Sequence, residues 1–275
     1  MATASSDAMG VDLEKIGWAD SKLTDHIKTA YKNIGVSYRR LRPYCETMMK
    51  AAEIFEDADA LLSPTDQHSL IAAALFGRSY ACFIAAVRLS LSGQLSETSV
   101  LLRALLENAL YAFHIANDPP LATVWLDRHR NKSCEVQCKK VFQIACMWKA
   151  LEAKAPRLAN ETKKYYNTHI DRGAHPNERS VFPNLVLRDG QSGLALRIFN
   201  CDEGLMRASI CMISITAKLT FEISSLAFPA EFAQHNLRVK IRNLNEQTAA
   251  LRAETARRLR MACKGSGKRQ KGRRN

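Results

Sequence analysis

The chain has 275 residues, of which 47% are hydrophobic, 24% charged and 7% aromatic, with only 12 Gly and 8 Pro. This length is enough to bury a sizeable core, and this composition excludes an intrinsically disordered chain and favours helices. The formal net charge is +13 at pH 7. Nine basic residues and no acidic residue lie in 257–275, which leaves +4 of that charge on the rest of the chain.

The N-terminal part of the sequence predicts a flexible segment followed by two helices. Residues 1–20 are polar and lack the basic and then apolar stretch of a signal peptide, so we expect them to be flexible and not to be a targeting leader. The first helix is predicted over residues 21–33, with Ser21 as its N-cap. The second is predicted over residues 37–62, with a basic start around Pro43.

Two apolar helices form the centre of the predicted bundle. Residues 63–66 read Ser-Pro-Thr-Asp, which is typical of a helix start, and the helix that they open is predicted to end at Gly93. The next helix, over residues 96–116, is apolar on nearly all sides, as expected for a helix buried within a bundle. It is predicted to end at the Asn-Asp-Pro-Pro of residues 117–120, because proline cannot continue a helix.

The region that follows is predicted to be less regular. Shorter helices are expected over residues 121–129 and 134–154, with a break around Pro156. Residues 171–200 are rich in turn-forming residues and contain no long periodic segment. We therefore expect this region to depart from the regular bundle.

A β-hairpin is predicted within the turn-rich region. Residues 185–188 read Leu-Val-Leu-Arg and residues 194–198 read Leu-Ala-Leu-Arg-Ile, and a glycine-bearing turn at 189–193 separates them. Two strands cannot form a domain by themselves. The hairpin, near residues 181–199, is therefore expected to be a small insertion in the bundle.

The C-terminal part predicts two more helices and a basic tail. A strongly apolar helix over residues 205–226 should return to the core. The last helix, over 230–262, carries a stripe that can pack on the bundle or on a second copy of the chain: Leu237, Ile241, Leu244, Thr248, Leu251 and Thr255. Residues 263–275 have no apolar face and are predicted to be disordered. The predicted fold class is all-α, with one helical-bundle domain over residues 21–262, the hairpin insertion and a long C-terminal helix.

The eight cysteines are scattered and predict neither disulfides nor a zinc site. Cys82, Cys146 and Cys211 lie in apolar runs, where a thiol behaves as a small hydrophobic side chain. Cys134 and Cys138 are four residues apart, which is not the spacing of a zinc knuckle, and no second pair accompanies them. We expect a cytoplasmic protein without a metal or another cofactor.

Several functional classes are disfavoured by the sequence. No membrane span is expected, because Arg78 and Arg88 interrupt one of the two most apolar stretches, and Lys218 and Glu222 interrupt the other. There is no Gly-rich phosphate loop and no Gly-x-Ser-x-Gly motif. The acidic residues also lack the close pairing that glycosidases and two-metal enzymes need.

The basic tail predicts an attraction to polyanions. Its cations include six candidate nucleic-acid-binding residues: Lys264, Lys268, Arg269, Lys271, Arg273 and Arg274. They would bind RNA or DNA through the release of counterions, without reading the base sequence. A solubilising tail that has no specific partner is the alternative.

Three polar residues on the second central helix are candidates for a site. Arg103, Glu107 and His114 are spaced by four and seven residues and fall within roughly 40° of one another around the helix axis. Arg78 and Arg88 lie on the preceding apolar helix. Because charged side chains are seldom buried without a partner, these residues either form a structural network between two core helices or line a cleft.

A second cluster lies in the Gly- and Pro-containing loop that follows. His169, Asp171 and His175 could ligate a metal, but their spacing matches no strong metal signature. Arg172 and His175 could instead contact a phosphate group or transfer protons, and the capping of helix ends is the alternative. We expect no metal here and add Arg172 to the candidate nucleic-acid-binding residues.

Two motifs in these regions resemble a known family. A helix that ends at Gly93 is followed by Leu-Arg-x-Leu-x-Glu at residues 102–107, and a later loop carries Gly-Ala-His-Pro at 173–176. Over roughly residues 65–180 the chain is thereby similar to bacterial helical proteins of unknown function that resemble the HEPN superfamily (higher eukaryote and prokaryote nucleotide-binding). These helical bundles include many metal-independent ribonucleases of phage-defence and toxin systems.

The resemblance implies a ribonuclease in a stress or phage-defence system, working as a homodimer. In such enzymes an Arg and a His lie four to six residues apart on one helix, where the His handles the proton of the attacking ribose hydroxyl and the Arg stabilises charge on the phosphate. This chain departs from that motif, since only two residues separate Arg172 from His175. We expect a different set to line the catalytic cleft: Arg103, Glu107, His114 and His175.

Two hypotheses remain. In the first, the chain is a helical-bundle ribonuclease or phosphodiesterase. In the second, it is a binding or regulatory protein whose polar network is structural and whose tail docks on nucleic acid. The first gains support if His175 lies within about 5 Å of the side chains of Arg103 and Glu107 at an open pocket. The first is to be abandoned if His175 points into solvent while Arg103 and Glu107 are sealed inside with other partners.

Overall fold

The computed structural model describes most of the chain, and of residue 259 and residues 262–271 it describes the backbone alone. Most of the N-terminal segment predicted to be flexible, the tip of the predicted hairpin and the end of the predicted tail lie outside the described residues: 1–18, 188–192 and 272–275. The described ranges are 19–187 and 193–271.

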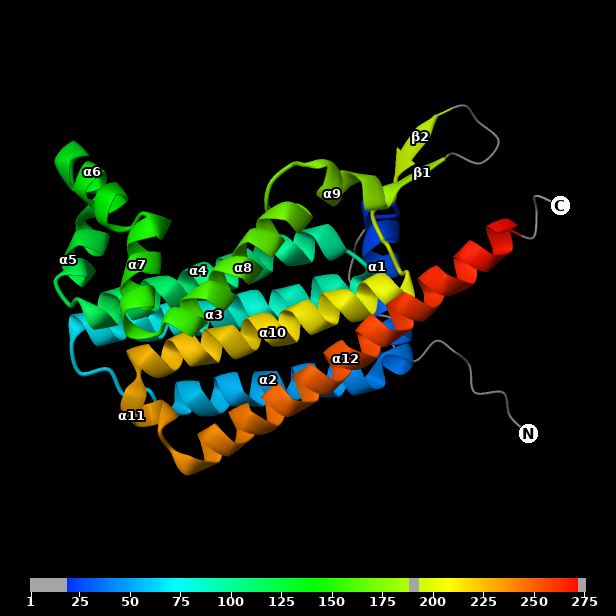
Figure 1. Cartoon of the computed structure of the whole chain (residues 1–275). Helices are drawn as coiled ribbons and strands as arrows, with labels where there is room; N and C mark the ends of the chain where they lie inside the picture. Colours follow the sequence, from blue (N-terminus) through cyan, green and yellow to red (C-terminus); the bar gives the residue numbers. More distant parts are fainter. Residues whose placement is uncertain (1–18, 188–192, 272–275) are drawn as a thin grey trace.

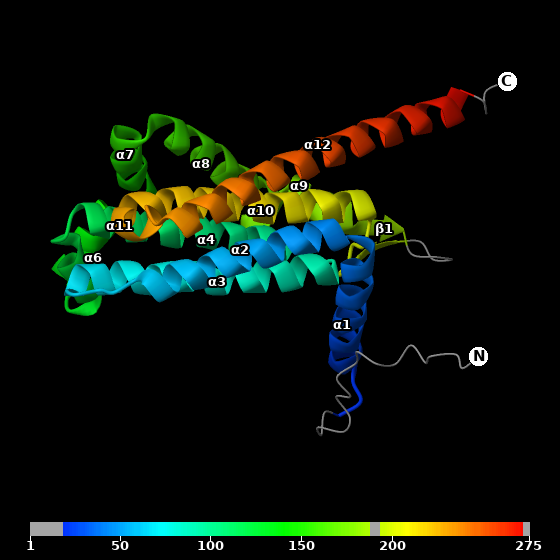
Figure 2. The same cartoon turned by 90° about the horizontal axis from the view of Figure 1, so that it is seen from below.

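Long helices that run side by side form the body of the molecule (Figure 1). They are α2 (Arg42–Leu61), α3 (Gln67–Ser92), α4 (Leu95–Asn117) and α10 (Glu203–Ala227). The first helix, α1 (Lys22–Arg40), stands across one end of this bundle (Figure 2). The last helix, α12 (His235–Lys271), packs on α2 and α10, and its C-terminal part extends beyond the bundle (Figures 1 and 2).

Short elements lie on the outside of α4 and at the ends of the bundle (Figure 1). After α4 come α5 (Leu121–Leu126), the 3₁₀ turn η1 (Asp127–His129), α6 (Lys132–Val141), α7 (Ile144–Lys154) and α8 (Pro156–His169). A π-helical turn η2 (Ile170–Ala174), α9 (Glu178–Val181) and the 3₁₀ turn η3 (Phe182–Asn184) follow. The four-residue helix α11 (Pro229–Phe232) connects α10 to α12.

The predicted fold class is confirmed. Among the described residues, the regular elements are helices apart from one antiparallel hairpin of β1 (Leu185–Leu187) and β2 (Leu194–Leu196). Leu185 pairs with Leu196, so both strands fall within the predicted segments. The hairpin is a small insertion at one end of the bundle, as expected (Figure 1).

Some element boundaries differ from the prediction for local reasons. The first helix continues through Gly35 to Arg40, and the second begins at Arg42 instead of residue 37, with Pro43 in its first turn. The predicted break at Pro156 is the first residue of α8, where proline is tolerated. The helix predicted over 134–154 is interrupted between α6 and α7. The backbone of α12 is helical to Lys271, further than the predicted end of the last helix.

Phenylalanines fill the centre of the bundle. Phe55 of α2 contacts Phe76 and Phe83 of α3 and Phe221 of α10, with ring centroids 4.5 to 5.5 Å apart. Such tilted aromatic pairs add to the stabilisation that burial of their area provides. A second apolar cluster joins α4 and α10 to α7 and α8. Because α4 contributes to both clusters, it is the buried central helix that the sequence predicted.

Two of these helices are long and apolar enough to cross a membrane, by length and composition alone: α3 and α10. In the described structure, 44% of the most apolar stretch of α3 and 67% of that of α10 is buried inside the fold. Helices in the core of a bundle have this composition because they are apolar on most sides.

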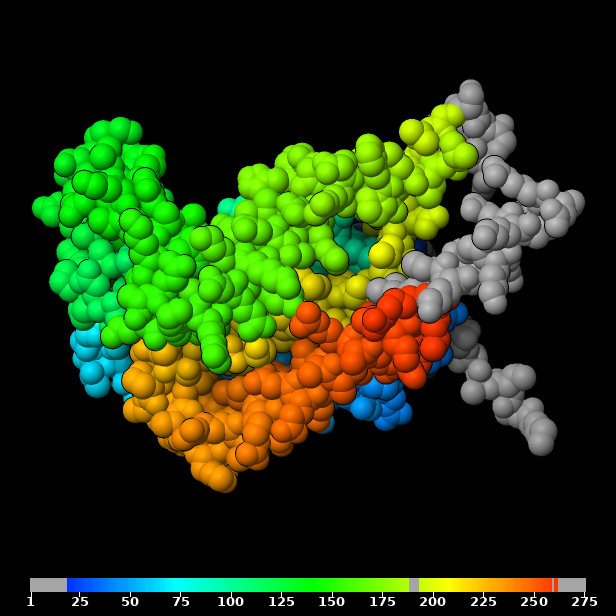
Figure 3. All heavy atoms as spheres, in the orientation of Figure 1, coloured from blue at the N-terminus to red at the C-terminus, as the bar shows by residue number. Residues whose placement is uncertain are grey.

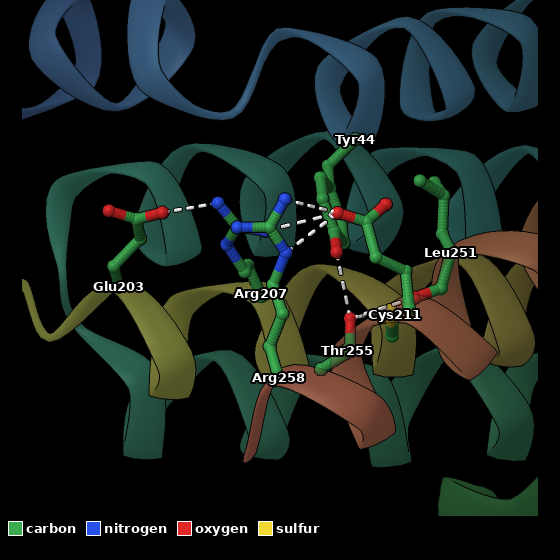
Figure 4. A network of polar contacts seen from close by, with 8 residues as sticks. Tyr44, Glu203, Arg207, Cys211, Leu251, Thr255 and Arg258 are labelled. Carbon is green, nitrogen blue, oxygen red and sulfur yellow. Dashed lines mark hydrogen bonds and ion pairs between the residues drawn. The ribbon is translucent and has the colours of Figure 1, made fainter. Parts of the chain in front are cut away.

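A polar network holds α12 against the bundle (Figure 4). Arg207 of α10 is nearly buried, forms ion pairs with Glu203 and with Glu254 of α12, and lies 5.5 Å from the ring of Tyr44 of α2. The Tyr44 hydroxyl is 2.9 Å from the Thr255 hydroxyl. Since Leu237, Leu244, Thr248 and Thr255 are also buried, the predicted stripe of the last helix packs on its own bundle.

Replacing Arg207 by Ala should destabilise the fold. The substitution leaves Glu254 without this partner and removes the cation that covers Tyr44. We expect the free energy of unfolding in urea to fall by about 2–4 kcal/mol. Arg257→Ala, which removes an exposed arginine of α12, should change it by less than about 0.5 kcal/mol. Equal effects of the two substitutions would show that Arg207 does not hold α12.

Candidate functional site

The candidate site is built on one exposed turn of the buried helix α4. Arg103 and Glu107 are one helical turn apart, and Arg103 Nε lies 2.9 Å from Glu107 Oε1. Their side chains are 26% and 34% exposed. The pair is therefore neither sealed in the core nor free in solvent.

Tyr166 of α8 completes this pair from the side. Its hydroxyl donates a hydrogen bond of 2.7 Å to Glu107 Oε1 and accepts one of 3.2 Å from Arg103 Nε. The guanidinium carbon of Arg103 lies 5.3 Å from the centroid of the Tyr166 ring, a cation–π contact. The Trp148 ring packs edge-on against Tyr166, with centroids 5.5 Å apart. Arg103 is thereby held by a carboxylate, a hydroxyl and an aromatic face.

The protonation states of this cluster follow from its surroundings. Burial, together with the hydrogen bond to the Glu107 carboxylate, raises the pKa of Tyr166 to about 12. Burial alone would lower the pKa of Arg103, but Glu107 and Tyr166 outweigh this effect and raise it. At neutral pH the tyrosine is therefore a neutral donor and the arginine is a fixed cation.

His175 approaches the arginine from the loop after η2. The side chain of His175 is exposed, and its Nε2 atom lies 3.1 Å from Arg103 Nη1. A guanidinium can only donate, so Nε2 accepts and presents its lone pair to Arg103. His175 thus lies within the expected distance of Arg103 and is exposed, but the pockets that Glu107 and Arg172 line include neither Arg103 nor His175.

Close packing of the loop on α4 brings His175 to this position. A Cβ atom on Gly173 would lie only 2.1 Å from the backbone oxygen of Ser96, so no larger residue fits there without moving the loop. The Ser96 hydroxyl donates to the backbone oxygen of Ser180, and Asn184 Nδ2 donates to the Ser96 hydroxyl. Asn177 caps α9 and also bonds the backbone oxygen of Ile170. Glycine and short polar side chains therefore fix the loop against the start of α4.

His114 does not join the other three candidates. It shares a helix face with Arg103, but eleven residues along a helix correspond to about 16 Å of axial separation. Its Nε2 atom lies 3.1 Å from the backbone oxygen of Val141, and its ring packs edge-on against Phe142. Burial lowers the pKa of His114. The residue therefore joins α4 to the end of α6.

The two arginines of the preceding helix form no charged network with Arg103 in the described structure. Arg78 and Arg88 are exposed, so the alternative of a structural network between two core helices is wrong for α3, whereas Arg78 lines a pocket that Glu107 also lines. Both positions fall on the solvent side of α3, while Phe76 and Phe83 fill its inner side. The charged pair of α4 is completed by α8 instead.

The residues considered for metal binding point in different directions. His169 is completely buried, and its Nε2 atom lies 2.9 Å from the Thr216 hydroxyl. Asp171 pairs with Arg179 at 3.1 Å, and His175 contacts Arg103. Among the side chains that the structure describes, no group of three or more His, Cys, Asp or Glu residues is arranged to hold a metal ion.

Arg172 lies at the mouth of a hollow next to the site. Figure 3 shows this hollow between the segment after α8 and helix α10, with α4 at its base. Its volume is about 500 Å³, and hydroxyl and amide side chains line much of it: Ser96, Ser99, Thr168, Asn184, Asn200 and Ser209. Arg172 is exposed and has no ion pair with a described residue, whereas Arg179 is paired with Asp171. Arg172 is thus available to an anion that enters from solvent.

The remaining nucleic-acid-binding candidates belong to the tail. The backbone of α12 passes through Lys264, Lys268, Arg269 and Lys271, whose side chains are outside the described part of the structure. Arg273 and Arg274 lie beyond the described residues. Their role stays a prediction.

Searches with this chain found no matching protein-family model, no matching curated protein and no matching solved structure.

Replacing Tyr166 by Phe tests the central hydrogen bonds. The substitution keeps the ring under Arg103 and removes only the hydroxyl that bridges Glu107 and Arg103. We expect the free energy of unfolding to fall by about 1–2 kcal/mol. Tyr165→Phe is the matched control, because Tyr165 is equally buried and its hydroxyl makes no hydrogen bond to a described residue. A smaller loss for Tyr166→Phe than for Tyr165→Phe would contradict the proposed bridge.

His169 predicts a dependence of stability on acid. The Thr216 hydroxyl donates its proton to the backbone oxygen of Met212, so it accepts from His169 Nε2 and leaves Nδ1 buried without a partner. Burial, with a smaller contribution from Arg172, lowers the pKa of His169 to about 3. Between about pH 6.5 and pH 3 the unfolded chain binds a proton at this histidine and the folded chain does not. The free energy of unfolding should therefore be highest above about pH 6.5 and fall as the pH is lowered towards 3.

The change should be measurable by urea denaturation across this pH range. His169 alone contributes a slope of at most about 1.4 kcal/mol per pH unit. His169→Gln keeps a donor for Thr216 but cannot take up a proton, so its stability should depend less steeply on pH. Equal slopes for the wild type and His169→Gln would contradict a buried neutral His169.

Proposed function

We propose that the chain is a ribonuclease that cleaves the phosphodiester bond with Arg103 and His175. The observation that carries this proposal is the 3.1 Å contact between Arg103 Nη1 and the exposed His175 Nε2. An imidazole whose lone pair accepts from Arg103 thereby lies next to a cation that two side chains hold in place. Acid–base transfer and the stabilisation of phosphate charge need these two groups.

The proposed reaction begins when a phosphate oxygen of RNA binds the guanidinium of Arg103. This contact replaces the one to His175, whose Nε2 atom becomes free to accept the proton of the adjacent ribose 2′-hydroxyl. The 2′-oxygen attacks phosphorus, and the bond from phosphorus to the 5′-oxygen breaks. The imidazolium returns the proton to the leaving 5′-oxygen. The products are a 2′,3′-cyclic phosphate and a 5′-hydroxyl end.

Glu107 and Tyr166 are positioning residues in this proposal. Both bond the Nε atom of Arg103, and its Nη1 atom faces His175. A guanidinium fixed before the substrate binds need not be reoriented as negative charge develops on the phosphate. The exposed Arg172 next to the site would contact a neighbouring phosphate, and the basic tail would attract the polyanion.

The resemblance to HEPN bundles supports the same reaction and suggests its biological setting. That family uses an Arg and a His, typically on one helix and paired across a dimer, in helical bundles of defence and toxin systems. We propose, on this likeness alone, a cytoplasmic enzyme of a stress or phage-defence system that works as a homodimer. In this chain the Arg would come from α4 and the His from a loop, instead of both from one motif.

A non-catalytic binding or regulatory protein is the second candidate. One observation favours it: Arg103, Glu107 and Tyr166 satisfy one another without a ligand, and the arginine occupies the His175 lone pair. In that case the network joins α4, α8 and the loop, and the tail alone contacts nucleic acid. The ribonuclease candidate predicts RNA cleavage that requires His175, whereas the binding candidate predicts no cleavage.

Cleavage of a labelled single-stranded RNA by the purified protein in EDTA distinguishes them. We expect the wild type to produce 2′,3′-cyclic phosphate ends and to leave DNA of the same sequence intact, because DNA lacks the attacking hydroxyl. His175→Ala should lower the rate by about 10²- to 10⁴-fold, and Arg103→Lys by about 10²- to 10³-fold. His235→Ala, which changes an exposed histidine of α12, is the control and should cleave normally.

The outcomes separate the hypotheses. Wild-type cleavage that persists in His175→Ala would remove this histidine from the mechanism and overturn the proposal. RNA binding without cleavage, weakened by salt and by truncation before Lys264, would support the non-catalytic candidate.

A further inference from the structure

A second pocket lies on the other side of Glu107 from the arginine–histidine pair. It is formed by α3, α4 and α5 with η1, at the end of the bundle where α5 crosses α3 and α4 (Figure 1). Its volume is about 720 Å³. Pockets for small organic ligands have about 300 to 1,000 Å³, so this one has the size of a ligand site.

The floor of this pocket is apolar. Ile71 and Leu75 of α3 are nearly buried there, and Leu70 at the edge is 58% exposed. Ala104 of α4 and the half-buried Trp125 of α5 complete this surface. Apolar side chains that line a concave surface stabilise a bound apolar group by removing both from water.

Two arginines without acidic partners lie at the rim. Arg78 of α3 is exposed, and Arg128 of η1 is half buried; neither forms an ion pair or a hydrogen bond with a described residue. The Nε atom of Arg128 is shielded from solvent and has no hydrogen-bond partner among the described residues. A buried donor without an acceptor is costly. An acceptor from a ligand would offset that cost.

One acidic residue lines this pocket against two arginines. It is Glu107, whose Oε1 atom also accepts hydrogen bonds from Arg103 and Tyr166, so its charge is shared with Arg103. The other polar side chains of the wall are neutral, namely Asn108 and Tyr111. The pocket therefore combines an apolar floor with an excess of positive charge at its rim.

We propose that this pocket binds a small organic anion with an apolar body. The apolar body would lie on the floor against Trp125, and a carboxylate or similar group would accept hydrogen bonds from Arg128 and Arg78. Charge complementarity at the rim and the limited volume select such a ligand over a neutral one or a macromolecule. This proposal does not rest on the proposed ribonuclease activity, and the binding that tests it is measured without RNA.

Isothermal titration of the full-length protein with decanoate tests this site. We expect saturable binding at one site per chain, and binding of the neutral decanamide at least about 10-fold weaker, because the amide lacks the charge that the arginines recognise. Arg78→Ala should weaken decanoate binding about 10-fold. Arg88→Ala is the matched control, because it removes another exposed arginine of α3 outside the pocket, and it should change binding by less than about twofold.

A variant that fills the pocket while the protein stays folded separates loss of the binding site from loss of folding. Ala74 lines the pocket from the exposed side of α3, so Ala74→Trp should occupy the space while helical circular dichroism and thermal stability are retained. We expect this variant to lose decanoate binding. Absence of decanoate binding by the wild type, equal affinity for decanamide, equal weakening by Arg78→Ala and Arg88→Ala, or full binding by Ala74→Trp would each overturn the proposal.

Discussion

The candidate site depends on how a guanidinium is held on an otherwise buried helix. Helix α4 contributes to both apolar clusters of the protein, and a charged side chain on it needs a partner. Arg103 finds Glu107 one turn later and Tyr166 on α8, and the remaining exposed side of the arginine faces His175. The same contacts that make Arg103 tolerable in this position also fix its direction. The contacts that stabilise the Arg103 cation on α4 are thus the same contacts that direct its guanidinium towards His175.

Glu107 connects this cluster to the rest of the surface. On one side its carboxylate holds Arg103 and Tyr166, and on the other side it borders the pocket between α3, α4 and α5. The hollow that contains Arg172 lies beyond the opposite end of the cluster, around the start of α4. Helix α4 therefore contributes residues to both pockets and also carries Arg103, which pairs with His175 of the loop. The polar network of Arg207 is separate and serves to hold α12.

The fold was largely accessible from the sequence, because helical periodicity, proline positions and the glycine-bearing turn are local signals. The expectation that His175 joins Arg103 went beyond the resemblance, whose motif places the Arg and the His on one helix, and nothing local relates residues 72 positions apart. Tyr166 was missed: it follows another tyrosine on a polar helix, and only the crossing of α8 over α4 distinguishes the two. His114 was wrongly grouped with Arg103, because angular agreement around a helix ignores separation along its axis.

The central claim is that Arg103 and His175 act on RNA as one unit, and a double-mutant cycle on RNA cleavage tests it most directly. The variants are Arg103→Lys, His175→Asn and the two combined. If the residues act together on the same phosphate, the combined variant should cleave within about threefold of the slower single variant. Losses that multiply in the combined variant, or a wild type that leaves RNA intact, would contradict the account.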